Sequence, residues 1–215
     1  GLLMSPVEYR GKKPKLERPS WIKVAVPGDD SLKRVGELMS KGGLHTVCQE
    51  AHCPNIYECW QRGTATFLIL GEVCTRKCGF CAVSKGSPTP VDPDEPGELA
   101  EAAARLDLKH VVITSVDRDD LPDGGAGQFA KTLEAPRETV PRATTEVFVP
   151  DFRPDPVLGL EIVLNANPTI FSHNVETVRR LYPAARPGSN YDHSVSLLAS
   201  AAEKIGGDRV KSSLI

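Results

Sequence analysis

Six cysteines lie between Cys48 and Cys81, and their spacing divides them into two sets of three. The second set, Cys74, Cys78 and Cys81, has the pattern C-x3-C-x2-C. A cubane cluster has four irons, so three thiolates would leave one iron open to a small molecule. A purely structural cluster has no need of an open iron. The spacing therefore predicts a reactive iron–sulfur site.

Two other interpretations of these cysteines have a physical basis. Zinc is usually held by four ligands in paired C-x2-C units, and only Cys78 and Cys81 have that spacing. Disulfides are typical of small secreted domains, whereas 215 residues are enough to build an apolar core. Clustered cysteines in an intracellular enzyme more often bind metal or carry out redox chemistry. The cluster interpretation is favoured over both.

The first set, Cys48, Cys53 and Cys59, has the less specific pattern C-x4-C-x5-C. His52 stands next to Cys53, so a zinc site built from cysteine and histidine is the alternative for this set. Spacing alone leaves both possibilities open here.

Composition restricts the class of protein. Hydrophobic residues make up 40% of the chain, charged residues 25%, and the formal net charge is -2, as in ordinary soluble globular proteins. A charge so close to zero gives no general signal of nucleic-acid binding. No apolar run approaches the ~18 residues that span a bilayer, and residues 1–4 are too short for a signal-peptide core. We expect a soluble, cytoplasmic protein whose first residue, Gly1, indicates a processed or trimmed start.

Three regions are predicted along the chain. Residues 1–30 form an arm, because prolines and basic residues interrupt any regular period. Residues 31–63 form an extension with a helix over 31–41, capped by Ser31, followed by the first cysteine set. From residue 64 buried strands alternate with helices. Strands are predicted over 64–70, 110–116, 145–150, 169–172 and 210–215, and helices over 97–106, 128–139, 156–164, 174–181 and 194–205. Pro136 is expected to stop or kink its helix.

This alternation predicts an α/β fold, a parallel sheet curled into a partial (βα) barrel of about five units over 64–215. Chemistry in such folds lies at the carboxyl ends of the strands. The loop with Cys74 follows the first strand, Thr114 and Ser115 end the second, and Asp151 and Asn174 follow the third and fourth. All would face one mouth.

The loop from Cys74 to Cys81 resembles that of the radical S-adenosylmethionine (radical SAM) superfamily. The resemblance implies that the open iron chelates S-adenosylmethionine and that reductive cleavage gives a radical able to abstract hydrogen from an unactivated carbon. Phe80, before the last cysteine, would pack near the adenine or simply shield the cluster. Thr114 and Ser115 would bind the methionine amino group, or only cap the strand end.

Asn174 and Glu176 would bind the adenosyl ribose. The alternative is that Asn174 caps the helix predicted over 174–181 and that Glu176 is favoured there by the helix dipole.

Several segments are similar to one family within that superfamily, the lipoyl synthases. They are His45–Trp60, which contains the first cysteine set, together with Gly63–Phe67, Cys74–Cys78, Thr114–Gly125, Val149–Phe152 and His173–Thr177. The resemblance implies insertion of two sulfur atoms at C6 and C8 of an octanoyl-lysine. It also implies two 4Fe–4S clusters, of which the one on Cys48, Cys53 and Cys59 is the consumed sulfur source.

The partners implied are octanoylated lipoyl carrier domains, such as those of 2-oxoacid dehydrogenase complexes or the glycine-cleavage H protein. An electron donor such as ferredoxin or flavodoxin is also implied, with no nucleic acid and no membrane. In a eukaryote the location would be a mitochondrion or plastid. The competing classes are another radical enzyme, biotin-synthase-like or methylthio-transferring, and a non-enzymatic zinc module.

The family continues beyond a fifth strand to an Arg-Ser-Ser motif, one of whose serines ligates the second cluster. This sequence ends at Lys211–Ile215 without that motif, and Ser212 and Ser213 are assigned to the fifth strand. We therefore expect either a chain truncated at its C-terminus or a second cluster whose last ligand is supplied in another way.

Overall fold

The computed structural model describes residues 45–47, 53 and 55–215. The predicted arm over 1–30, the predicted helix over 31–41 and Cys48 lie outside these described residues. Within the part of the chain that is described, no helix is long and apolar enough to cross a membrane.

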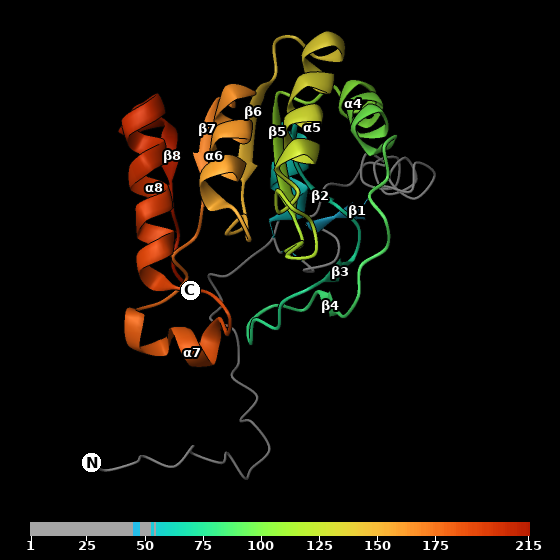
Figure 1. Cartoon of the computed structure of the whole chain (residues 1–215). Helices are drawn as coiled ribbons and strands as arrows, with labels where there is room; N and C mark the ends of the chain where they lie inside the picture. Colours follow the sequence, from blue (N-terminus) through green and yellow to red (C-terminus); the bar gives the residue numbers. More distant parts are fainter. Residues whose placement is uncertain (1–44, 48–52, 54) are drawn as a thin grey trace, which may run out of the picture.

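Five parallel strands form the centre of the molecule (Figure 1). They are β2 (Thr64–Ile69), β5 (His110–Ser115), β6 (Thr144–Phe148), β7 (Ile170–Ser172) and β8 (Val210–Lys211). The sheet order is β1-β2-β5-β6-β7-β8, in which β1 (His45–Thr46) pairs antiparallel with β2. The predicted α/β class and all five predicted parallel strands are confirmed, and among the described residues the sheet is open, with β1 and β8 at its edges.

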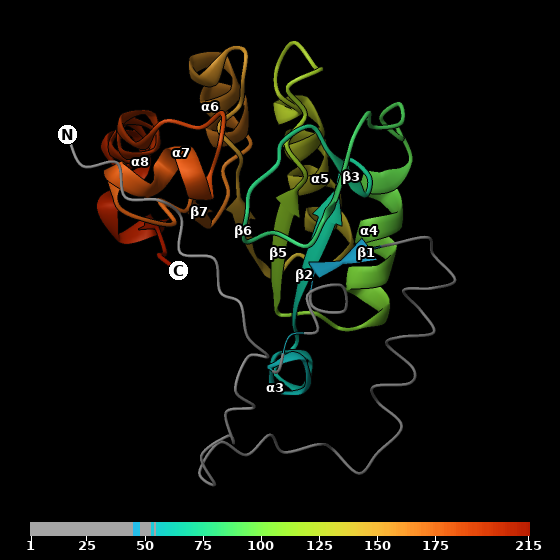
Figure 2. The same ribbon diagram turned by 90° about the horizontal axis from the view of Figure 1, so that it is seen from below.

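Helices connect successive strands and cover one face of the sheet (Figure 1). They are α4 (Glu95–Arg105), α5 (Ala126–Thr139), α6 (Pro156–Asn165) and α8 (Tyr191–Ile205). Strands that follow one another in the chain are neighbours in the sheet, so right-handed crossovers place every connecting helix on the same side. Seen from below, these helices form an outer layer around the strands (Figure 2).

The apolar core fills the space between the sheet and this helical layer. Alternate residues of the strands, such as Val111, Ile113 and Val147, are fully buried there. Helix side chains such as Phe129 and Leu133 meet them in one continuous cluster. The strand period of two therefore separates a helix-facing side from the side that a barrel would enclose.

Pro136 does not stop its helix, because α5 continues to Thr139, the end predicted from the sequence. The alternative outcome, a kink at Pro136, stays a prediction. Only the last turn follows the proline, so its missing N–H removes a single hydrogen bond near the helix end. The N–H of Val140 then donates to the Pro136 carbonyl at 2.7 Å and closes the helix.

The helix predicted over 174–181 is wrong. Residues 174–178 are not helical, and helical structure begins only with η1 (Arg179–Leu181), followed by α7 (Tyr182–Ala185). Glu176 has a φ of 67° and forms a parallel bridge with Leu214. Its N–H donates to the Ser213 carbonyl and its carbonyl accepts from Ile215, so the C-terminal segment takes the backbone groups that a helix would have used.

The fifth strand is also shorter than predicted, because β8 ends at Lys211 after η2 (Gly207–Arg209). Ser212 and Ser213 lie after it. The Ser212 hydroxyl accepts from the N–H of Val175 at 3.3 Å, and the Ser213 hydroxyl donates to the Asn174 side chain at 2.6 Å.

Candidate active site at the carboxyl edge of the sheet

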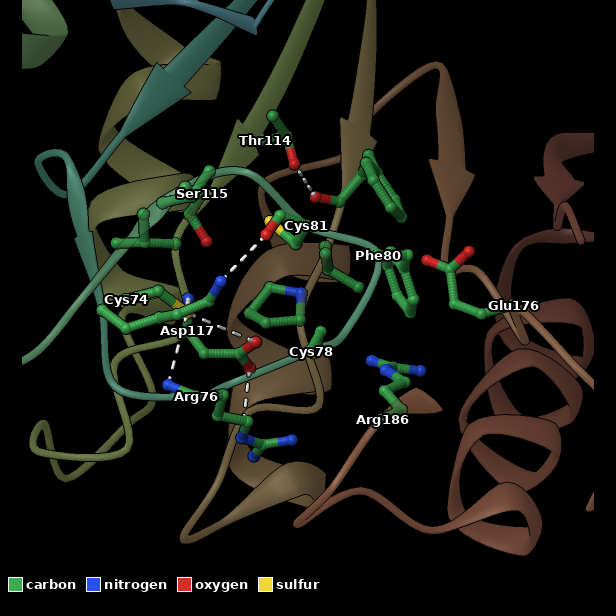
Figure 3. Close-up of a pocket in the computed structure, with 16 residues that line it drawn as sticks. Cys74, Arg76, Cys78, Phe80, Cys81, Thr114, Ser115, Asp117, Glu176 and Arg186 are labelled. Atoms are coloured by element: carbon green, nitrogen blue, oxygen red, sulfur yellow. Dashed lines mark hydrogen bonds and ion pairs between the residues drawn. The ribbon is translucent and has the colours of Figure 1, made fainter. Parts of the chain in front are cut away.

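A cavity of about 150 Å³ opens at the carboxyl ends of the strands (Figure 3). The three cysteines of the C-x3-C-x2-C loop line it, together with side chains from the exits of β5, β6 and β7. The lining residues are Cys74, Arg76, Cys78, Phe80, Cys81, Val83, Lys85, Thr114, Ser115, Val116, Asp117, Phe148, Val149, Pro150, Glu176 and Arg186. The mouth predicted from strand order is therefore present and is lined by the predicted cysteine loop.

The loop is closed at its base by two short parallel strands, β3 (Val73–Cys74) and β4 (Ser84–Lys85). The N–H of Gly86 donates to the Cys74 carbonyl at 3.1 Å. The Lys85 ammonium donates to the Cys81 carbonyl at 2.9 Å, and the N–H of Gly79 donates to the carbonyl of Ala185 at 2.9 Å. Both ends of the loop are thus fixed by hydrogen bonds.

Two backbone N–H groups point at the sulfur of Cys74. Its sulfur accepts from the N–H groups of Arg76, at 3.4 Å, and Asp117, at 3.3 Å. Burial raises the pKa of both Cys74 and Cys78, and the nearby Asp117 carboxylate raises them further. Burial also raises the pKa of Asp117, to about 6. A bound cation or cluster would reverse this balance, because it favours the deprotonated thiol.

Three thiols around one cavity fit the ligand set of an iron–sulfur cluster. Among the described residues, no group of three or more cysteine, histidine or acidic side chains converges as the ligands of a single ion would. Cysteines on a cubane each bind a different iron, so their sulfurs need only surround a common space. Cys74, Cys78 and Cys81 are all half-buried and line the same cavity.

A buried ionic cluster lies beneath the cysteine loop. The Arg76 guanidinium pairs with Asp151, which is fully buried at the exit of β6. The second oxygen of Asp151 pairs with Arg186 at 3.2 Å and lies 3.6 Å from the His173 ring. A carboxylate with two arginine partners is stable where an unpaired charge would not be.

This cluster changes the protonation of its members. Burial opposes ionisation of Asp151, but Arg186 and Arg76 outweigh it and hold its pKa at about 2. Burial lowers the pKa of His173 to about 4, despite the attraction of Asp151. His173 Nδ1 therefore donates to the Val149 carbonyl at 2.9 Å, while Nε2 accepts from the Ser194 hydroxyl at 3.0 Å.

Four of the five residues predicted to contact S-adenosylmethionine line the cavity, namely Phe80, Thr114, Ser115 and Glu176. Phe80 is 44% exposed at the rim, and the Thr114 hydroxyl is already used by the Phe148 carbonyl at 3.0 Å. The Ser115 hydroxyl is buried without a hydrogen-bond partner in the structure. Burial raises the pKa of Glu176, whose carboxylate points toward Phe80 (Figure 3).

Asn174 does not line the cavity. Since the predicted helix is absent, it is not a helix cap either. Its side chain accepts from Ser213, and the Asn174 backbone carbonyl accepts from Arg186 at 3.0 Å. The ligand contacts proposed for all five residues remain predictions.

The first cysteine set is described only in part. Cys53 and Cys59 are half-buried, and Cys59 lies on α3 (Ile56–Gln61). Cys48 is outside the described residues. The assignment of these three cysteines to a second cluster therefore remains a prediction.

Sequence reasoning missed the ionic cluster as a unit. Arg76 lies between two predicted ligands, and Asp151 and His173 follow predicted strands. The sequence alone therefore indicated that these three residues lie at the mouth of the predicted barrel. No sequence signal marked Arg186. It follows α7, a four-residue helix that is too short for the hydrophobic pattern to reveal. Their pairing depends on contacts between distant parts of the chain.

The fold and the cysteine loop together define a class of protein. The sequence model of the Radical SAM superfamily matches residues 68–214, which contain the whole parallel sheet from the end of β2 onward. The structure is similar to that of methylornithine synthase, with a TM-score of 0.54 and 14% identity over 87% of this chain and 58% of that one. That likeness supports the fold alone.

Curated relatives define the family more closely. The chain is 49% identical to a lipoyl synthase of Methylococcus capsulatus, over 98% of this chain and 65% of that protein. It is 46% identical to one of Chromobacterium violaceum, over 98% and 67%, and 49% identical to one of Rubrobacter xylanophilus, over 96% and 65%. The chain thus spans about 65% of the length of the first of these relatives. It belongs to the lipoyl synthase family of the radical SAM superfamily.

Proposed function

We propose that this chain inserts two sulfur atoms, at C6 and C8, into an octanoyl group that is amide-linked to a lysine of a carrier domain. The observation that carries the proposal is the C-x3-C-x2-C loop, which surrounds a cavity at the carboxyl edge of a radical SAM sheet. The names of the similar curated proteins support the same activity.

Cys74, Cys78 and Cys81 would hold a 4Fe–4S cluster whose open iron faces the cavity. Cys48, Cys53 and Cys59 would hold a second cluster. When bound, the first cluster with S-adenosylmethionine supplies a radical able to take hydrogen from an unactivated carbon, and the second supplies sulfur. Two features of the chain fit a ligand beside the first cluster, namely the unpartnered hydroxyl of Ser115 and the buried carboxylate of Glu176.

The chain itself would exclude water and orient the ligand. Val83, Phe148 and Val149 give the cavity apolar walls, which limit side reactions of a reactive species. Glu176 would accept hydrogen bonds from ligand hydroxyls, since an ionised carboxylate is an acceptor only. Arg186 lines the same cavity and would attract a ligand carboxylate.

The partners follow from the proposed chemistry. The octanoyl group would arrive on a lipoyl carrier domain, of a 2-oxoacid dehydrogenase complex or a glycine-cleavage H protein. Reductive cleavage of S-adenosylmethionine needs an electron, which a ferredoxin or flavodoxin would deliver.

The test is anaerobic incubation of the reconstituted chain with S-adenosylmethionine, a chemical reductant and an octanoyl-lysine peptide. Mass spectrometry should detect a peptide that carries two added sulfur atoms, and a Cys78→Ala chain should give none. Formation of 5′-deoxyadenosine without a thiolated octanoyl product would point to another radical enzyme. A colourless chain with stoichiometric zinc would point to a zinc module.

Ser115→Ala tests the ligand side of the cavity. Because the Ser115 hydroxyl has no partner, its removal should leave the stability of the apoprotein unchanged or raise it slightly. The same substitution should weaken S-adenosylmethionine binding up to roughly tenfold, the value of one hydrogen bond of about 1.4 kcal/mol. Isothermal titration of the reconstituted chain measures the difference, and unchanged affinity would remove Ser115 from the binding site.

A further inference from the structure

Arg76 has an unusual position inside the cysteine loop. It lies midway between Cys74 and Cys78, yet only 4% of its side chain is exposed. Lys77, the next residue, is exposed. Two adjacent cations of one short loop thus have opposite environments. Only Arg76 is buried, so only its charge needs partners within the protein.

The guanidinium of Arg76 joins the loop to three distant segments. It donates twice to Asp119 after β5, from Nε at 2.8 Å and from Nη2 at 2.7 Å. Its Nη1 donates to the Ser189 hydroxyl before α8, at 2.9 Å, and pairs with Asp151 after β6. Figure 3 shows the side chain of Arg76 extending away from the cavity, below Asp117. Nearly every donor of the planar group is therefore used.

Thr75 reinforces the same attachment. Its N–H and hydroxyl both donate to the Asp117 carbonyl, at 3.1 and 2.9 Å, and the hydroxyl accepts from the N–H of Asp119 at 3.2 Å. The backbone and the side chain of Thr75 thus bind the segment after β5 that Arg76 also binds.

Fold stability alone does not account for this arrangement. Removing ions from water costs several kcal/mol each, and apolar replacements of similar volume often give equal or greater stability. The apolar core between the sheet and its helices already holds the fold together. A buried pair next to ligand cysteines has instead a geometric consequence, because a planar guanidinium with several partners admits few orientations.

We propose that Arg76, anchored by Asp119 and Asp151, is a positioning residue that sets the placement of Cys74 and Cys78 before a cluster binds. The inference rests on the proposed function, in that the loop is taken to hold a cluster. Its first consequence, an ordered loop in the apoprotein, can be tested without any cluster.

Hydrogen–deuterium exchange of the apoprotein tests that order directly. Arg76→Gln should speed amide exchange in residues 74–81 roughly tenfold relative to the unsubstituted chain, because local opening becomes easier. Exchange in α5 should speed up much less than exchange in the loop, because Asp151 keeps its pair with Arg186. Lys77→Gln, the matched control, should leave the loop as it is. Equal loop exchange in the Arg76→Gln and unsubstituted chains would overturn the proposal, as would faster exchange spread evenly over the whole fold.

Iron retention tests the second consequence. In a background with Cys48, Cys53 and Cys59 replaced by alanine, a chelator should remove iron from the Arg76→Gln chain 10- to 100-fold faster, the usual effect of removing a supporting partner of a ligand. Arg76→Lys should be intermediate, since one ammonium cannot hold both carboxylates in the same geometry. Lys77→Gln should match its parent, and equal iron loss in all four chains would contradict the proposal.

The two measurements separate the two hypotheses. If the unsubstituted chain binds no iron while Arg76→Gln still frees the loop, the proposed function fails and the positioning role stands. If iron binds but neither exchange nor iron loss responds to Arg76→Gln, the positioning role fails and the proposed function stands.

Discussion

The two cysteine-bearing regions differ in how the rest of the chain supports them. Around Cys74 and Cys78, the partners of the intervening Arg76 lie 43, 75 and 113 residues later in the chain. Around Cys53 and Cys59, the described backbone hydrogen bonds are local, from Ile56 to Cys53 and from Cys59 to Asn55. Among the described residues, Arg76 thus joins the first region to three distant segments, and backbone hydrogen bonds order the helix that carries Cys59.

The tertiary attachment of the first region fits the role proposed for its triad. A site that generates a reactive species benefits from ligands held in fixed positions, since misplacement of about 1 Å is costly. A store that is consumed in the reaction has no such requirement.

The largest expected effect separates the two triads by chemistry. Cys78→Ala removes a ligand of the proposed radical-generating cluster, so formation of 5′-deoxyadenosine should fall by roughly 100-fold or more. Cys59→Ala should leave that reaction nearly intact while it abolishes the thiolated octanoyl product. Chromatography of the nucleoside and mass spectrometry of the peptide measure both in one mixture. Loss of 5′-deoxyadenosine in both variants would mean that the triads do not act separately.

The next effect tests the network beneath the first triad. Asp151→Asn leaves Arg76 and Arg186 without the buried charge that pairs them. Breaking a buried pair in this way costs about 3–5 kcal/mol, so the free energy of unfolding of the apoprotein should fall by about that amount. Urea denaturation of the apoprotein measures the loss. A change below about 1 kcal/mol would show that Asp151 is better hydrated than its burial implies.

Sequence reasoning reached the sheet and the cysteine loop because both are encoded locally. Five apolar β-branched segments and the spacing of Cys74, Cys78 and Cys81 can be recognised within short windows. The ionic network could not be recognised, since Arg76 and Arg186 meet Asp151 only after β6 and α7 are placed. The wrong helix over 174–181 has the same origin. Pairing of Glu176 with Leu214, far along the chain, overrides the local helical tendency.

A third effect, smaller than the second, concerns pH. The folded pKa of His173, about 4, lies below its usual value of 6.5, so the unfolded chain binds a proton that the folded chain does not. The contribution of His173 to stability should therefore fall as pH decreases from 6.5 to 4, by at most about 3 kcal/mol. Asp117, whose folded pKa of about 6 lies above its usual value of 3.8, contributes in the opposite direction below pH 6. Asp151, with a pKa of about 2, adds its own loss only below pH 4. Denaturation of both chains should show that the stability advantage of the unsubstituted chain over a His173→Gln chain shrinks as pH decreases from 6.5 to 4. A difference that stays constant over this range would exclude the His173 contribution.

The smallest effect belongs to the region of the first triad. Glu58 and Arg62 form an ion pair of 2.7 Å on α3, one turn apart, but both side chains are more than half exposed. Exposed pairs of this spacing contribute only about 0.3–0.5 kcal/mol, because water and salt screen them. Glu58→Gln should thus lower the free energy of unfolding by no more than that, and 0.5 M salt should remove the difference. A loss comparable to that of Asp151→Asn would mean that the helix carrying Cys59 depends on charges as strongly as the first triad does, and the contrast between the two regions would no longer hold.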